Sequence, residues 1–204
     1  LKWFRRPRKR DLQGSPPLEH GSLVVAVHVR RGDVKSTGPL SFRYLPNEYF
    51  LALLDSLRDE GSHRGWPLPL DVHVFSEPES DASWDEFLSR GVSVHLGGSL
   101  CDVWEHLMEA DVLITSKSSF SWVPAFYSPP SSIVVFTRFW HLPLRDWVVV
   151  DDVASMQEDA MSTRLPPSSS TGLVRIPPVP RQAPAVLVNT THLAAIVFDR
   201  LGRM

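Results

Sequence analysis

The sequence predicts an α/β fold, with a Rossmann-like, doubly wound parallel sheet covered by helices on both faces. Short apolar runs rich in valine and isoleucine alternate with segments whose apolar residues recur at helical spacing. The connections between these segments are short, and no internal repeat is visible. Alternation of this kind is typical of a parallel sheet, because each crossover between parallel strands needs a helix to bring the chain back.

The strands are expected in the valine-rich runs. The first covers residues 23–29, where an apolar run ends abruptly in charged residues. Further strands are predicted at residues 70–75, 92–95, 112–114 and 133–136, with an edge strand at residues 147–150.

The helices are expected between the strands and after the last one, at residues 46–60, 83–88, 103–110, 120–126 and 191–201. Pro46 suits the first turn of the first helix, because proline is preset for that position. Ser83 is the expected N-cap of the second helix, with Glu86 completing a capping box. Asp102 is the expected N-cap of the third.

The chain of 204 residues is expected to form one globular domain with flanking segments. The predicted order is a basic, then Pro- and Gly-containing linker at residues 1–21, the Rossmann-like domain at residues 22–152, a Pro- and Ser-rich irregular segment at residues 153–190 and a C-terminal helix at residues 191–204. Because the sequence begins with Leu1 rather than methionine, we expect it to be a piece of a longer protein. Neither a membrane span nor a signal peptide is expected in this sequence.

The charge of the chain is unevenly distributed. Of its 21 basic residues six lie in residues 1–10, which leaves 15 basic against 23 acidic residues in the remainder. This mildly acidic body disfavours general nucleic-acid binding, which depends on a broad basic surface. The basic N-terminus is expected to be a solvated arm, with a phosphate-binding or nuclear-type arm as the alternative.

Neither a disulfide nor a metal site is expected. Cys101 is the sole cysteine, so no internal disulfide can form. The histidines show no metal-ligand spacing. We therefore expect no structural metal and no metal cofactor.

The residues with the most distinctive chemistry follow the first strand. His28, Arg30, Arg31 and Asp33 stand at its end, and ligands of open α/β sheets lie just beyond the carboxyl ends of the strands. Because side chains alternate along an extended chain, one arginine can face a ligand while the other turns inward. We expect Arg31 to bind a phosphate group with its planar fork, and Arg30 to pair with Asp33 and hold the loop.

Other interpretations of this loop stay open. Its charged side chains can form an ordinary surface salt-bridge cluster, which contributes little to stability. Residues 31–33 also spell the cell-adhesion tripeptide Arg-Gly-Asp, although a position directly after a buried strand disfavours that use. His28 is expected to position a ligand or the loop rather than to act as a general base.

A second polar stretch follows the fourth strand. Ser116, Ser118 and Ser119 surround Lys117 and precede a helix, and a helix N-terminus offers N–H groups that bind anions. The alternative is that a serine merely caps the helix. Glu77, after the second strand, is a candidate for hydrogen bonds to a nucleoside. Together these residues predict a nucleotide or sugar-nucleotide site.

Three ordered motifs resemble the fucosyltransferase superfamily. Residues 28–33 resemble the H-x-R-R-G-D signature of α-1,2-fucosyltransferases, which has related forms in α-1,6- and protein O-fucosyltransferases. Residues 74–77 resemble the end of the family's second strand. Residues 102–108 and Asp111 resemble the helix that leads to its third motif, and residues 115–122 resemble its S-S-F-S-W segment.

The resemblance implies the C-terminal, donor-binding half of a GT-B glycosyltransferase. Such an enzyme moves fucose from GDP-fucose to a hydroxyl of a glycan or glycoprotein acceptor, with inversion and without a metal. By this resemblance the catalytic residues would be Arg31, which contacts the β-phosphate, and Arg30 and Asp33, which organise the loop. His28 and Glu77 would contact the nucleoside. The donor's pyrophosphate and base would be held by Ser116, Ser118, Ser119 and Phe120.

Two questions stay open at this stage. The alternative to an enzyme is a non-catalytic nucleotide- or glycan-binding module, or a fragment without its acceptor half. The Golgi or ER lumen is expected if the full-length parent carries a signal anchor, and the cytoplasm otherwise. Five tryptophans are expected to pack against other residues rather than to line an acceptor groove, namely Trp84, Trp104, Trp122, Trp140 and Trp147.

Overall fold

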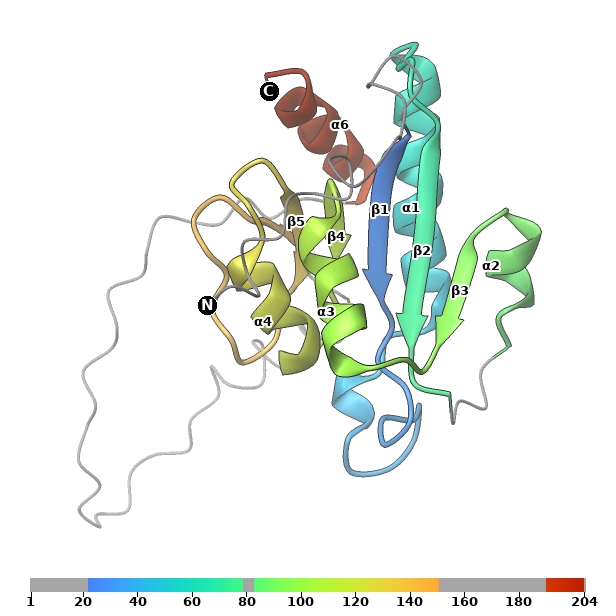
Figure 1. Ribbon diagram of the computed structural model, residues 1–204. Coiled ribbons are helices and arrows are strands. Elements are labelled where there is room, and N and C mark those ends of the chain that lie inside the picture. The colour runs from blue at the N-terminus through green and yellow to red at the C-terminus, as the bar shows by residue number, and fades with distance from the viewer. Residues whose placement is uncertain (1–21, 79–82, 151–189, 204) are drawn as a thin grey trace, which may run out of the picture.

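The computed structural model of the chain describes residues 22–78, 83–150 and 190–203 (Figure 1). The linker expected at residues 1–21 and nearly all of the irregular segment expected at residues 153–190 lie outside the described residues. The expected domain at residues 22–152 contains every described strand, and the last helix follows it.

The strands form one six-stranded, all-parallel sheet in the order β3-β2-β1-β4-β5-β6. They are β1 (Leu23–His28), β2 (Leu70–Ser76), β3 (Ser93–Leu96), β4 (Val112–Ile114), β5 (Ile133–Thr137) and β6 (Val148–Val150). This order characterises doubly wound sheets of the Rossmann type. The predicted fold class is therefore confirmed.

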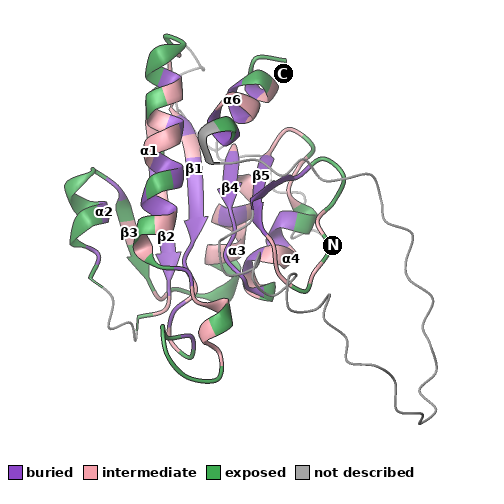
Figure 2. Cartoon of the chain, turned by 180° about the vertical axis from the view of Figure 1, so that it is seen from behind, coloured by how far each residue is buried: buried purple, intermediate pink, exposed green. Residues whose placement is uncertain are grey.

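Helices cover both faces of the sheet (Figures 1 and 2). One face carries α1 (Asn47–His63), α2 (Asp85–Ser89) and α6 (Thr190–Leu201), and the other carries α3 (Leu100–Glu109) and α4 (Ser119–Tyr127). A short 3₁₀-helix, η4 (Ser41–Arg43), lies in the long connection between β1 and α1. No helix in the described ranges has the length and apolar character that crossing a membrane requires.

The winding of the chain places a switch point between β1 and β4. From β1 the chain steps outward to β2 and β3, and then returns through α3 to β4 on the other side of β1. The chains leaving β1 and β4 therefore diverge although the two strands are neighbours, with Val27 beside Ile114. Ligands of open α/β sheets bind in the crevice outside such a pair of strand ends.

The core has one apolar layer on each face of the sheet. Along β1, Val25 and Val27 belong to the layer under α1, whereas Ala26 belongs to the layer under α3 and α4. The central strands are buried from both sides, as Figure 2 shows for β1, β4 and β5. Burial on both faces explains why these strands read as continuous apolar runs.

Helix α6 belongs to the same core. Its residues Leu193, Val197 and Phe198 are buried in the layer that contains α1. The Phe198 ring packs on Trp66 at 5.2 Å between centroids, and the tip of the ring lies against Gly61 of α1. The helix predicted at the C-terminus is thus part of the sheet domain.

Several predicted helix ends were wrong. Helix α1 runs to His63, beyond the predicted end at residue 60. Ser99, not Asp102, caps α3, because its hydroxyl oxygen accepts from the backbone N–H of Asp102 at 3.2 Å. Ser83 pairs with Asp85 rather than forming the expected capping box. Ser99 stands three positions before the predicted cap Asp102, and Asp85 stands one position before the predicted partner Glu86.

Candidate functional site

The candidate site lies at the carboxyl ends of β1 and β4. The loop that follows β1 and the short segment from Thr115 to Ser118 that follows β4 leave the sheet at the same edge (Figure 1). The topology thus brings together the two polar stretches that the sequence singles out, although they are separated by more than 80 positions.

A carboxylate from β2 fixes the loop after β1. Arg30 forms ion pairs with both Asp33 and Glu77. The other oxygen of Glu77 accepts from the backbone N–H of Arg31 at 2.7 Å. Gly32 has φ +69°, a left-handed conformation that favours glycine, and lies against the Glu77 side chain. The expected pairing of Arg30 with Asp33 is confirmed, and both Glu77 oxygens already have protein partners.

Arg31 is buried, with 3% of its surface exposed. Its guanidinium donates to the carbonyl oxygen of Arg30 at 2.8 Å and to the side-chain oxygen of Asn47, and it lies over the Tyr44 ring at 4.6 Å. Its Nε has no hydrogen-bond partner. Burial lowers the pKa of Arg31 below its ordinary value, yet a guanidinium remains protonated in proteins.

The buried Arg31 guanidinium lacks a carboxylate partner among the described residues. Neutral hydrogen-bond acceptors and an aromatic face hold it instead. A buried cation of this kind is costly and is stabilised by an anion. The same burial removes the adhesion interpretation, because the arginine of an Arg-Gly-Asp signal must be exposed.

His28 joins the two loops. Its Nδ1 lies 2.9 Å from the Ser116 hydroxyl, and its ring stacks on Phe120 at 5.0 Å between centroids. Burial, together with the charges of Arg30 and Arg31, lowers the pKa of His28 to about 3. The imidazole is therefore neutral at physiological pH and weakly basic, which fits the expected positioning role better than general-base catalysis.

The serines after β4 have different surroundings. The Ser116 hydroxyl is bonded to His28, and the buried Ser118 caps α4 by accepting from the backbone N–H of Phe120. Ser119 is exposed and its hydroxyl lies 2.8 Å from Nε2 of His141. The capping alternative thus holds for Ser118, and Ser119 is the serine that stands open to solvent.

The segment around η4 connects the arginine loop to the serine loop, and sequence reasoning missed it. Lys117 is buried and donates from Nζ to the Phe42 carbonyl oxygen at 3.0 Å. Arg43 donates from Nε to the Lys117 carbonyl oxygen at 3.2 Å. The ring of the next residue, Tyr44, packs against the Arg31 guanidinium. No pattern in the sequence marks these residues, because their importance comes from contacts across 74 or 75 positions.

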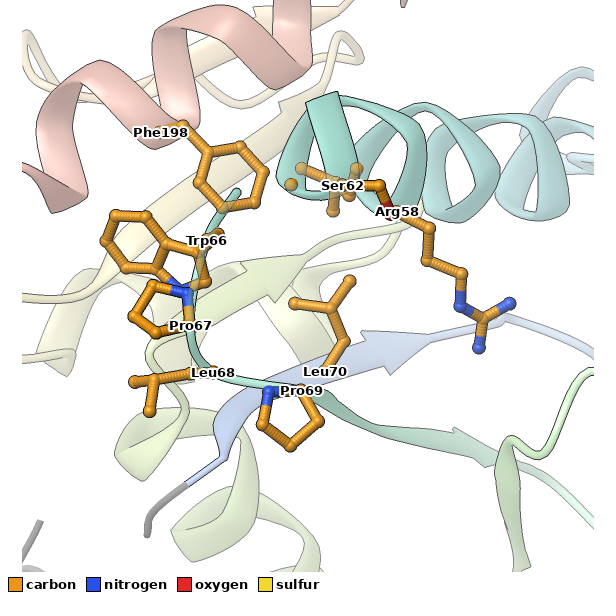
Figure 3. Close-up of a pocket in the computed structure, with 10 residues that line it drawn as sticks. Arg58, Ser62, Trp66, Pro67, Leu68, Pro69, Leu70 and Phe198 are labelled. Carbon is orange, nitrogen blue, oxygen red and sulfur yellow. The ribbon is translucent and has the colours of Figure 1, made fainter. Parts of the chain in front are cut away.

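The opposite edge of the sheet holds a pocket of another kind (Figure 3). Its volume is about 450 Å³, and mostly apolar residues line it between α1, the start of β2 and Phe198 of α6. Arg58 is the charged residue in its wall, and it donates to the Arg90 carbonyl oxygen at 2.9 Å. The pocket offers none of the converging cations found at the other edge, so we assign the candidate site to the ends of β1 and β4.

Comparisons of the chain with protein-family models, with curated proteins and with solved structures found no match. Within the described ranges, no three His, Cys, Asp or Glu side chains are grouped so that they could hold a metal ion.

Proposed function

We propose that this domain binds a nucleoside diphosphate at the switch point between β1 and β4, as the donor-binding half of a glycosyltransferase. The observation that carries the proposal is the buried Arg31 guanidinium, which lacks a carboxylate partner among the described residues. Lys117 adds a second buried cation at the same edge. An anionic ligand there would give the Arg31 guanidinium the charged hydrogen-bond partner that neutral groups now replace.

A diphosphate would replace a neutral partner of Arg31. The side-chain oxygen of Asn47 is a neutral acceptor, and a phosphate oxygen forms a charge-assisted bond that is roughly twice as strong. Because Arg31 is only 3% exposed, this exchange requires the side chains that cover the guanidinium to shift. Arg30, Asp33 and Glu77 would hold the backbone after β1 in place.

The three motifs that resemble fucosyltransferases support GDP-fucose as the donor. In the proposed reaction an acceptor hydroxyl forms a bond to the anomeric carbon of fucose, while the bond from that carbon to the β-phosphate breaks and its electron pair leaves with GDP. Arg31 would stabilise the charge that develops on GDP. Loss of a comparable charge-stabilising donor costs about 10²–10³ in rate.

The first prediction concerns Arg31 itself. We expect GDP to raise the melting temperature of the chain, and the Arg31→Gln variant to bind GDP about ten- to hundredfold more weakly, because it loses charge-assisted hydrogen bonds. Calorimetry and thermal unfolding measure both effects. Arg58→Gln is the matched control, since Arg58 lies at the pocket on the opposite edge. A folded wild type that binds neither GDP nor pyrophosphate at millimolar concentration contradicts the proposal, as does an Arg31→Gln variant with unchanged affinity.

Turnover separates the enzyme from the non-catalytic module. GDP-fucose is supplied to the full-length protein with a mixture of glycan and glycoprotein acceptors, and GDP release is compared with and without acceptor. Acceptor-dependent release supports fucose transfer. Tight binding of GDP, with no release of GDP from GDP-fucose, supports a binding module. Stronger binding of UDP or ADP than of GDP contradicts the choice of donor.

A further inference from the structure

The following inference rests on the proposed nucleotide site and concerns the place of the base. By the motif resemblance, His28 and Glu77 would contact the nucleoside. In the structure His28 is buried under Phe120 and bonded to Ser116, and Glu77 is engaged by Arg30 and the Arg31 backbone. A base at this site therefore needs another surface.

An exposed aromatic surface lies on the β5 side of the same edge. Trp140 is 55% exposed and Phe42 is 44% exposed, and their ring centroids are 6.4 Å apart. The packing that we predicted for the tryptophans therefore covers only part of Trp140. Phe42 belongs to η4, and its carbonyl oxygen accepts from Lys117. The two rings are therefore neighbours, and the Phe42 backbone is bonded to the loop that carries the serines.

The loop that carries Trp140 is fixed against α4. His141 contacts the Ser119 hydroxyl and stacks on Trp122 at 4.7 Å between centroids. The indole N–H of Trp122 donates to the Leu142 carbonyl oxygen at 3.2 Å. These contacts hold the Trp140 ring beside the N-terminus of α4, so a ligand would meet it already in place.

Arg43 gives this surface a polar edge. Its guanidinium lies over the Trp140 ring at 4.7 Å, and its Nε donates to the Lys117 carbonyl oxygen. In the described part of the chain Arg43 forms no ion pair. Its terminal nitrogens are donors of the kind that recognise the O6 and N7 acceptors of guanine.

We propose that the purine base of the nucleotide stacks on Trp140 and Phe42, with Arg43 as hydrogen-bond donor to the base edge, while its diphosphate is held at Arg31. An aromatic ring held in place beside a cation suits a flat, acceptor-rich base. This assignment puts the base on the β5 side of the diphosphate, instead of on the β2 side where Glu77 lies.

The test compares ligands with and without a base. Stacking of a base on an aromatic side chain is lost in Trp140→Ala, so we expect GDP to bind about five- to hundredfold more weakly. Pyrophosphate, which has no base, should bind Trp140→Ala as it binds the wild type. Trp140→Phe keeps a ring and should retain most of the GDP affinity. Tyr127→Ala is the matched control, because Tyr127 is an exposed aromatic residue at the last position of α4, whereas the proposed surface lies beside the first turn of that helix.

The outcomes distinguish this inference from the proposed function. Weaker GDP binding with unchanged pyrophosphate binding supports it, and a smaller preference for GDP over UDP in Arg43→Ala supports the role of the cation. Unchanged GDP binding in Trp140→Ala overturns the inference and leaves the diphosphate site standing. Equal losses for GDP and pyrophosphate also overturn it, because Trp140 would then support the loop rather than the base. Absence of binding of either ligand to the wild type overturns both proposals.

Discussion

At the scale of single residues, the site depends on groups buried without their usual solvation. Arg31 is a buried cation, and His28 is a buried imidazole beside two guanidiniums. His28 stays neutral because protonation would add a third positive charge in a place that water cannot reach. Its hydrogen bond to Ser116 and its contact with Phe120 then tie the loop after β1 to the helix after β4.

The burial of His28 predicts an acid-sensitive stability. Its pKa is about 3 in the folded chain and about 6.5 in the unfolded chain, so the unfolded state binds the extra proton between these values. This contribution to stability is complete above pH 6.5 and is lost as the pH falls towards 3, at about 1.4 kcal/mol per pH unit. Chemical denaturation of the wild type and of His28→Asn from pH 7.5 to pH 5 should show the steeper loss in the wild type. Parallel profiles for the two proteins would contradict the assignment.

At the scale of elements, α1 and α6 are matched to each other at one glycine. A Cβ atom at Gly61 would stand 2.9 Å from the tip of the Phe198 ring, closer than such atoms pack. Arg64 at the end of α1 also pairs with Asp199 of α6 at 2.6 Å. The close approach explains why a residue with poor helix propensity lies inside α1.

The glycine contact predicts a substitution whose effect changes sign. Gly61→Ala should destabilise the chain by up to about 2 kcal/mol, because the clash with Phe198 outweighs about 1 kcal/mol gained from helix propensity. Phe198→Leu removes the ring tip, so in that background Gly61→Ala should be neutral or stabilising. Denaturation of the four proteins of this cycle measures the coupling. The same loss in both backgrounds would show that the contact is not the cause.

At the scale of the whole molecule, the apolar pocket and the candidate site lie at opposite edges of one sheet. The apolar pocket and the α1–α6 contact lie at the amino end of β2, whereas the cations and the aromatic surface lie at the carboxyl ends of β1, β4 and β5 (Figures 1 and 3). Parallel strands separate the two edges, since every strand begins at one edge and ends at the other.

This separation predicts that the two edges respond independently. Phe198→Leu should lower stability by about 1–2 kcal/mol through lost packing, while the rise in melting temperature caused by GDP stays close to that of the wild type. The Arg31→Gln variant should show the opposite pattern, with a reduced effect of GDP. Thermal unfolding with and without GDP checks both variants. A loss of GDP binding in Phe198→Leu would mean that the two edges are coupled.

The sequence by itself determined the approximate positions of the strands, the doubly wound parallel fold class and the two polar stretches at strand ends. It did so because the patterns involved are local, such as the apolar run before His28 and the serines before α4. It also predicted the pairing of Arg30 with Asp33, which are three residues apart. It placed the N-cap of α3 wrongly, because several neighbouring polar residues can close the same turn.

Only the tertiary structure decided how the site is built. The burial of Arg31 on Tyr44, the use of Glu77 to hold the loop, the link from Arg43 to Lys117 and the exposure of Trp140 all depend on contacts between distant segments. The alternation of side chains along a strand says which face a residue takes, but not which partner comes from elsewhere in the chain. That choice is made when the sheet assembles and the loops after β1, β4 and β5 meet at one edge.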